Sequence, residues 1–241
     1  MALDITSTLN TGDVDDTHLD QAVVEITTNY VSGEDVLSFT DAGGISGVWD
    51  AANGRMTLSG NATVAQYETA LQSVQYSNSS DNPSTQTRTV SFTLSDTTDS
   101  STTVTRQISV TAEDDAPTLS GIEGTALSYT ENDVALAITS TLSTGDIDDT
   151  HLDQAVVEIT TNYVNGEDVL SFTDAGGISG VWDAANGRMT LSGNATVAQY
   201  QAALQSVQYS NSSDNPSTLV RTVSFTAVSY THLTLPTILL V

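Results

Sequence analysis

The sequence contains no lysine and no cysteine, and arginine is its only strongly basic residue. Five arginines face 30 acidic residues, which gives a formal net charge of −25. Nucleic-acid binding needs clustered basic side chains, so this balance argues against a nucleic-acid partner and against anionic membrane surfaces. Without cysteine there is no disulfide framework. No apolar run is long enough to span a bilayer, so we expect no direct membrane insertion.

Threonine, serine and valine are abundant instead, and 38% of the residues are hydrophobic. Hydrophobic residues alternate with polar ones in short runs such as "TRTVSFTLS", where Val90, Phe92 and Leu94 fall on one face. "VTRQISVTA" follows the same pattern, and Asn53-Gly54 is a hairpin signal. These patterns predict an all-β protein built from many short strands.

One stretch departs from the alternation. In "ATVAQYETALQSV" the hydrophobic residues follow helical spacing, and Thr63 with Gln66 forms a T-x-x-Q capping box. The spacing predicts one short helix over Val64 to Gln72. Many short strands with regular turns favour Greek-key β-sandwiches of the immunoglobulin type, each with one short helix.

The chain is an internal repeat. Ala2–Thr93 matches Ala135–Thr226 at an offset of 133, with eight substitutions in 92 aligned positions. A period this long indicates tandem domains, not a solenoid. We therefore expect one repeat over residues 1–115 that lacks its first strand. A second repeat, over residues 116–226, lacks its last strands.

The C-terminal segment 227–241 matches neither copy. Its end, "VSYTHLTLPTILLV", resembles the translated read-through of a sequencing adapter, which predicts a non-native tail. The alternative is a native apolar edge strand.

Acidic residues gather in "TGDVDDTHLDQ" and in its second copy. Alternate side chains of an extended loop point to the same side, so Asp13 and Asp15 are expected to converge on one ion. Asp146, Asp148 and Asp149 form the corresponding cluster of the second copy. Carboxylates about 4 Å apart repel by roughly 1 kcal/mol in water and about 4 kcal/mol at an effective dielectric near 20. Ca²⁺ suits such a set of oxygen ligands, although the spacing is not that of an EF-hand.

Two further acidic segments surround the joint between the copies. "AEDDAP" contributes Asp114 and Asp115, and "YTENDV" contributes Glu131. A joint with this many carboxylates would repel itself without a cation. The alternative is that these loops are simply solvated surface.

Up to Thr226 the chain resembles the bacterial cadherin-like tandem repeats of large, calcium-dependent, RTX-type surface adhesins. The resemblance rests on "DDAPTL", "YTEND", "GDIDDTHLDQAVVEI", "GEDVLSF" and "YSNSSDNPST", in this order. It implies Ca²⁺ near the inter-domain joint, held by Asp114 or Asp115, by Glu131, and by Asp146 with Asp148. The first copy lacks a "YTEND" equivalent, so its site around Asp13 is expected to be incomplete.

The expected function is structural: an extender repeat of a secreted bacterial surface adhesin, stiffened by Ca²⁺ for cell adhesion or biofilm formation. Its partners would be neighbouring repeats of the same chain, and its location extracellular or on the cell surface. The competing hypothesis is a module that binds a surface glycan or protein directly, for example through Trp49 or Trp182. No nucleophile motif accompanies the histidines, so we expect no enzyme.

Overall fold

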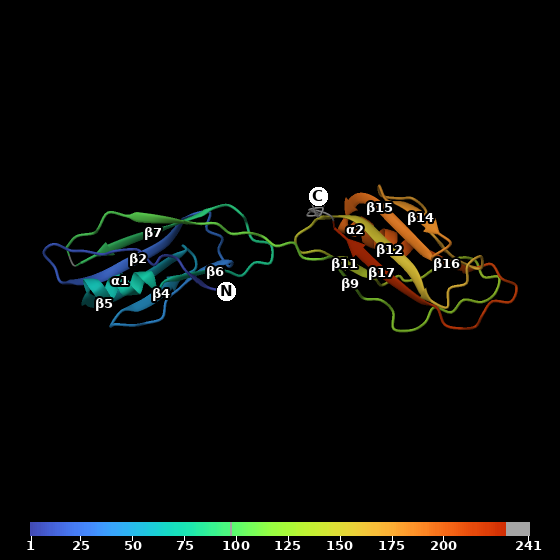
Figure 1. Cartoon of the computed structure of the whole chain (residues 1–241), viewed down its shortest axis with the longest axis horizontal. Coiled ribbons are helices and arrows are strands. Elements are labelled where there is room, and N and C mark those ends of the chain that lie inside the picture. Colours follow the sequence, from blue (N-terminus) through green and yellow to red (C-terminus); the bar gives the residue numbers. More distant parts are fainter. Residues whose placement is uncertain (97, 230–241) are drawn as a thin grey trace, which may run out of the picture. The chain divides into compact units, whose positions relative to one another are not determined.

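A computed structural model describes residues 1–96 and 98–229 of the chain (Figure 1). The chain divides into two compact units, Met1–Glu113 and a second that begins at Asp114. The predicted boundary lies two residues later, after residue 115. Each unit is an all-β sandwich with one short helix, as the sequence predicts.

Unit 1 has two antiparallel sheets. The smaller has the strand order β1-β6-β3 and the larger has the order β4-β5-β2-β7-β8. Strand β2 therefore lies between β5 and β7, which both follow it later in the chain. The elements are β1 (Leu3–Asp4), β2 (His18–Thr28), β3 (Asp35–Ser38), β4 (Ser46–Asp50), β5 (Arg55–Thr63), α1 (Val64–Gln72), β6 (Gln75–Asn78), β7 (Arg88–Ser95) and β8 (Val104–Ile108).

Unit 2 repeats this plan with two differences. Its sheets have the orders β10-β16-β13 and β14-β15-β12-β17, and an extra pair joins β9 to β11. Among the described residues nothing corresponds to β8, so β17 lies at a sheet edge. The elements are β9 (Thr118–Ser120), β10 (Leu136–Ala137), β11 (Ser143–Gly145), β12 (His151–Thr161), β13 (Asp168–Ser171), β14 (Ser179–Asp183), β15 (Arg188–Thr196), α2 (Val197–Ser206), β16 (Gln208–Asn211) and β17 (Thr222–Val228).

The core of unit 1 forms because alternate residues of the long strands face inward. Val24 and Ile26 of β2 pack with Val90 of β7, and all three are buried. Helix α1 lies beside β2 and β5 and closes the core with Tyr67 (Figure 1). The phenol of Tyr67 donates a hydrogen bond to the Gly60 carbonyl at 2.8 Å, which satisfies its one polar atom.

The predicted helix and hairpin are confirmed. α1 has the predicted bounds, and its capping box joins the Thr63 and Gln66 side chains to each other's backbone N–H groups. The hairpin between β4 and β5 turns through four residues, 51–54. Gly54 adopts a φ of 67° there, a conformation that favours glycine.

A polar cluster is buried at one end of each sandwich. The side chains of Asp35 and Arg88 are both 0% exposed, and Arg88 Nε lies 3.2 Å from Asp35 Oδ2. Asp35 also accepts hydrogen bonds from the Tyr76 hydroxyl at 2.5 Å and the Asn78 amide at 2.8 Å. The Val31 backbone N–H donates to it at 2.8 Å. Burial acts to raise the pKa of Asp35, but these donors together hold it below its ordinary value.

In unit 2 Asp168 occupies the same position and pairs with Arg221 at 3.2 Å. The Arg221 side chain is 13% exposed, whereas Arg88 is not exposed. This difference follows from the fold, because β17 has no outer neighbour among the described residues and β7 is covered by β8. Two further arginines, Arg55 and Arg188, pair with glutamates on the neighbouring long strand.

The structure extends the second repeat slightly. β17 continues to Val228 and pairs with β12 through Ala227 and Val228, two residues beyond the predicted end at 226. The rest of the predicted non-native tail, residues 230–241, lies outside the described residues.

Candidate metal centre

The acidic loop of unit 2 lies between β11 and β12. The backbone N–H groups of Asp148 and Asp149 donate to Asp146 Oδ1, at 3.1 and 2.8 Å. The loop is therefore a tight turn capped by its own aspartate, a common use of this residue. It is not the extended loop that the sequence predicts. Asp13 forms the same turn in unit 1.

The segment that begins unit 2 reaches this turn. The backbone N–H of Asp115 donates to Asp148 Oδ2 at 2.6 Å. Strand β9 follows at once and pairs with β11 through Ser120–Ser143, Leu119–Thr144 and Thr118–Gly145. The structure thus brings Asp115 together with Asp146 and Asp148, and Asp114 is the neighbouring residue. With Asp149 of the same turn, these are five of the eight residues predicted to hold a metal.

The segment at Asp115 covers the unit 2 turn, and the carboxylates of this turn are less exposed to solvent than those of unit 1. Asp146, Asp148 and Asp149 are half-buried, whereas Asp13 and Asp15 of unit 1 are exposed. Oδ2 of Asp146 is buried and has no hydrogen-bond partner among the described residues, and Oδ1 of Asp148 is buried too. A buried anionic oxygen without a donor is costly, and a cation would offset that cost. An all-oxygen environment of this kind fits Ca²⁺.

The turn alone is not a complete site. Across the described residues, 1–96 and 98–229, no group of three or more acidic, histidine or cysteine side chains lies close enough to hold a metal. A Ca²⁺ at the turn would take part of its coordination from backbone carbonyls and water, as this ion readily does.

Glu131 is not brought to the turn. Two residues before it, the Tyr129 hydroxyl donates to the Asn211 carbonyl at 3.3 Å, and the Tyr129 ring packs edge-on against Tyr209. Asn211 in turn hydrogen-bonds Asp168. Asp168 belongs to the end of unit 2 where β12 finishes, because its carboxylate accepts from Val164. The aspartate turn precedes the start of β12, so Glu131 lies toward the other end of the unit.

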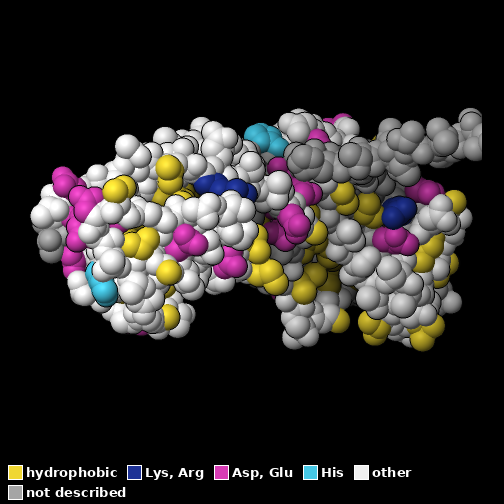
Figure 2. All heavy atoms as spheres, turned by 60° about the vertical axis from the view of Figure 1, so that its left-hand side comes forward, with side chains coloured by type: hydrophobic (Ala, Val, Ile, Leu, Met, Phe, Trp, Pro, Cys, Tyr) yellow, Lys and Arg dark blue, Asp and Glu magenta, His cyan; other side chains and the backbone are white. Residues whose placement is uncertain are grey.

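The turn of unit 1 meets a different acidic neighbour. Asp96, from the turn between β7 and β8, lies beside Asp16. Partial desolvation and the charges of Asp96, Asp13 and Asp15 raise the pKa of Asp16. Figure 2 shows acidic side chains gathered at one end of this unit. Sequence reasoning missed Asp96, and its only signal was its place between two predicted strands.

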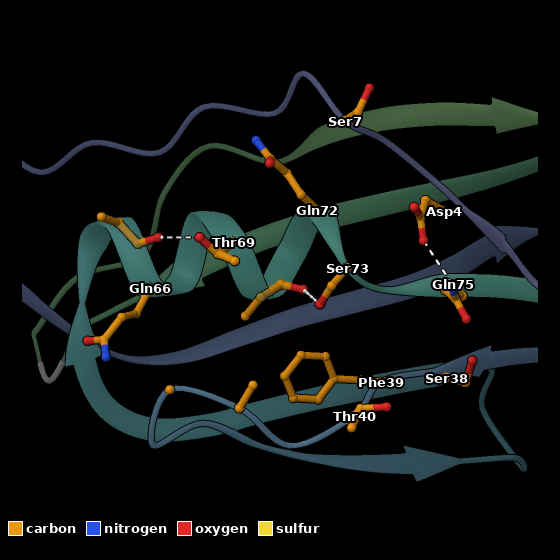
Figure 3. A pocket seen from close by; sticks show the side chains of 14 residues that line it. Asp4, Ser7, Ser38, Phe39, Thr40, Gln66, Thr69, Gln72, Ser73 and Gln75 are labelled. Carbon is orange, nitrogen blue, oxygen red and sulfur yellow. Dashed lines mark hydrogen bonds between the residues drawn. The ribbon is translucent and has the colours of Figure 1, made fainter.

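A groove runs along α1 of unit 1, with a volume of about 890 Å³. Figure 3 shows Phe39, Gln66 and Gln72 on its walls and a hydrogen bond from Gln75 to Asp4, which measures 3.0 Å. Trp49 does not contribute to this groove. It is half-buried, packs against the core and meets Tyr30 edge-on, with the two ring centroids 6.2 Å apart, so part of the ring covers the sandwich.

No helix among the described residues is long and apolar enough to cross a membrane. No known protein-family model matches the chain. A comparison with curated proteins finds no significant similarity.

Proposed function

We propose that the chain is part of a secreted bacterial surface adhesin in which it serves as a structural extender, and that Ca²⁺ bound at the Asp146–Asp148 turn orders the start of unit 2. The observation that carries this proposal is the buried Asp146 Oδ2, which has no donor among the described residues. Asp148, two residues away, holds the backbone of the entering segment at Asp115.

The contrast between the units supports the proposal. Their turns have the same sequence apart from Val14 and Ile147, and the same internal hydrogen bonds. In the part of the chain that the structure describes, the unit 2 turn is contacted by the segment at Asp115 and is half-buried, whereas Asp13 and Asp15 of the unit 1 turn are exposed. Burial lowers the local dielectric, so repulsion between the carboxylates and attraction to a divalent cation both become stronger there. The site favoured for Ca²⁺ is therefore in unit 2.

Bound Ca²⁺ would neutralise the carboxylates of the turn and so hold in place the chain segment that leads from one unit into the next. A tandem array whose connecting segments are held in this way would resist bending, and that is the property an extender requires. Extracellular calcium-binding modules work with dissociation constants of about 10⁻⁴ to 10⁻³ M. At 10 mM Ca²⁺ such a site would stabilise its unit by about 1.4–2.7 kcal/mol.

Denaturant unfolding with and without Ca²⁺ tests the proposal. The only tryptophans are Trp49 in unit 1 and Trp182 in unit 2, so a Trp49→Phe chain reports on unit 2 alone. Ca²⁺ should raise its unfolding midpoint, and a chelator should reverse the rise. Asp148→Asn should reduce the effect, whereas Asp15→Asn in the exposed turn of unit 1 should not. If neither Ca²⁺ nor a chelator changes the unfolding midpoint of unit 2, the proposed calcium site is refuted.

A further inference from the structure

The chain contains three Asn-Gly sequences, and the structure places one of them differently from the other two. They are Asn53-Gly54, Asn165-Gly166 and Asn186-Gly187. An asparagine followed by glycine is prone to deamidation, because glycine has no side chain to keep its backbone nitrogen away from the asparagine side chain. In a folded protein the reaction also requires that these two groups are free to approach each other.

Asn53 and Asn186 are held in the hairpin turns of units 1 and 2. The Asn53 side-chain amide donates to Asp50 Oδ2 at 2.7 Å. The Asn186 amide donates to Asp183 Oδ2 at 2.6 Å. Each following glycine is packed against a tyrosine ring, which a Cβ on the glycine would approach to 2.8 Å in unit 1 and 2.9 Å in unit 2. At these two sites both the side-chain amide and the neighbouring backbone are therefore restrained.

Asn165 lies in the turn between β12 and β13 of unit 2, and it is exposed. Among the described residues neither its side-chain amide nor the N–H of Gly166 has a hydrogen-bond partner. Gly166 has a φ of 88°, and a Cβ there would meet nothing within 4 Å. The two reacting groups are thus unrestrained and open to water. At the same position unit 1 has Ser32, whose hydroxyl donates to the Ala51 carbonyl at 3.0 Å.

We propose that Asn165 is a site of spontaneous deamidation, and that the fold protects the two hairpin asparagines from the same reaction. The Gly166 backbone nitrogen attacks Cγ of Asn165, its proton leaves with the side-chain amide as ammonia, and a cyclic imide remains. Water then opens the imide at one of its two carbonyl carbons. Cleavage of the newly formed C–N bond gives aspartate. Cleavage of the original peptide bond gives isoaspartate, in which the main chain runs through the side chain. The conversion consumes only water and releases only ammonia.

The turn that carries Asn165 also positions the buried Asp168. The Val164 N–H donates to Asp168 Oδ2 at 2.8 Å. The Val164 carbonyl accepts from the N–H groups of Glu167 and Asp168, at 3.1 and 3.0 Å. Isoaspartate would insert a methylene group into the main chain between these donors and acceptors, so the turn could not keep all three bonds. Either product also adds a negative charge close to Glu167 and Asp168. The modification should therefore destabilise unit 2 and leave unit 1 unchanged.

Incubation of the folded chain at mildly alkaline pH, followed by mass spectrometry of its peptides, tests the proposal. A glutamate-specific protease releases residues 159–167, and fragmentation of this peptide distinguishes Asn165 from Asn162. The mass shift of amide-to-acid conversion should appear at Asn165 at least about tenfold faster than at Asn53 or Asn186, because a hydrogen bond to a charged acceptor must first break at those sites. In urea, where the fold no longer protects them, all three asparagines should react at similar rates.

The residue that differs between the two units in this turn supplies matched controls. Asn165→Ser gives unit 2 the residue of unit 1 and should remove the reaction from the turn, whereas Ser32→Asn should introduce it in unit 1. In a Trp49→Phe chain the unfolding midpoint of unit 2 should fall during incubation, and Asn165→Ser should prevent the fall. The inference is overturned if Asn165 stays an amide while the unfolded chain reacts, or if all three sites of the folded chain react at one rate. It is also overturned if the Asn165→Ser chain loses unit 2 stability as fast as its parent, or if the modified chain unfolds at the original midpoint.

Discussion

The buried ion pair of Asp35 and Arg88 gives the sharpest prediction about stability. Asp35→Ala removes a carboxylate that accepts from Tyr76, Asn78, Val31 and Arg88. The Arg88 guanidinium would keep its bonds to the carbonyls of Ser84 and Gln86 but lose its counter-charge in a site without solvent exposure. The same change in unit 2, Asp168→Ala, leaves an arginine that is 13% exposed.

The magnitudes follow from this difference in exposure. Removing one partner of a buried ion pair costs about 3–5 kcal/mol, because the other charge stays buried without compensation. We expect that loss for Asp35→Ala. In Asp168→Ala, water can reach part of the Arg221 side chain. We therefore expect a loss of unfolding free energy of about 1–3 kcal/mol, which is the cost of leaving a polar group unsatisfied. A domain is stable by only about 5–15 kcal/mol, so both losses are measurable.

Urea unfolding followed by tryptophan fluorescence separates the two units. Asp35→Ala is measured with Trp182→Phe, and Asp168→Ala with Trp49→Phe, each against its own parent. Asp35→Asn keeps the shape of the side chain and one hydrogen-bond acceptor. It replaces the alanine variant in the measurement if that variant does not fold. A loss below about 1 kcal/mol in unit 1, or equal losses in both units, would show that the carboxylate does not compensate a desolvated charge.

Two further predictions concern pH and backbone conformation. Because the pKa of Asp35 and of Asp168 is lowered in the folded state, the stability they provide is complete above their ordinary pKa of about 4 and is lost as pH falls through the lower folded values. Acid titration of unfolding should show this loss, and Asp35→Asn should flatten it in unit 1. Gly60 has a φ of 149°, and a Cβ there would lie 2.2 Å from the Gly44 carbonyl oxygen. Gly60→Ala should therefore cost at least about 2 kcal/mol in urea unfolding, whereas Gly33→Ala, with nothing within 4 Å, should cost about 1 kcal/mol; equal losses would contradict the steric argument.

The fold could be predicted because its signals are local. The alternation of Val90 and Phe92 and the capping box at Thr63 depend only on near neighbours in sequence, and both predictions are confirmed. The buried Asp35 cluster could not be predicted in this way. Its members come from β3, β6 and β7, and nothing in the sequence around Asp35 indicates that three donors from other elements converge on it.

The candidate site was predictable only in part. Asp146 and Asp148 are neighbours in sequence, so their proximity was certain, but the choice between an extended loop and a self-capped turn depends on hydrogen bonds of the backbone. Glu131 was placed with them by resemblance alone, and the packing of Tyr129 on Tyr209 holds its segment elsewhere. Asp115 reaches Asp148 through β9 pairing, which sequence spacing does not specify.

The arginine pairs also bear on how copies of this chain would interact with one another. Four of the five cations sit opposite carboxylates of their own unit, so little positive charge is left to balance an exterior rich in aspartate. Copies of a chain with this composition would therefore repel one another at low ionic strength. The screening length of this repulsion is about 8 Å at about 0.15 M salt and about 3 Å at about 1 M. Added salt would therefore let copies of the chain approach one another more closely.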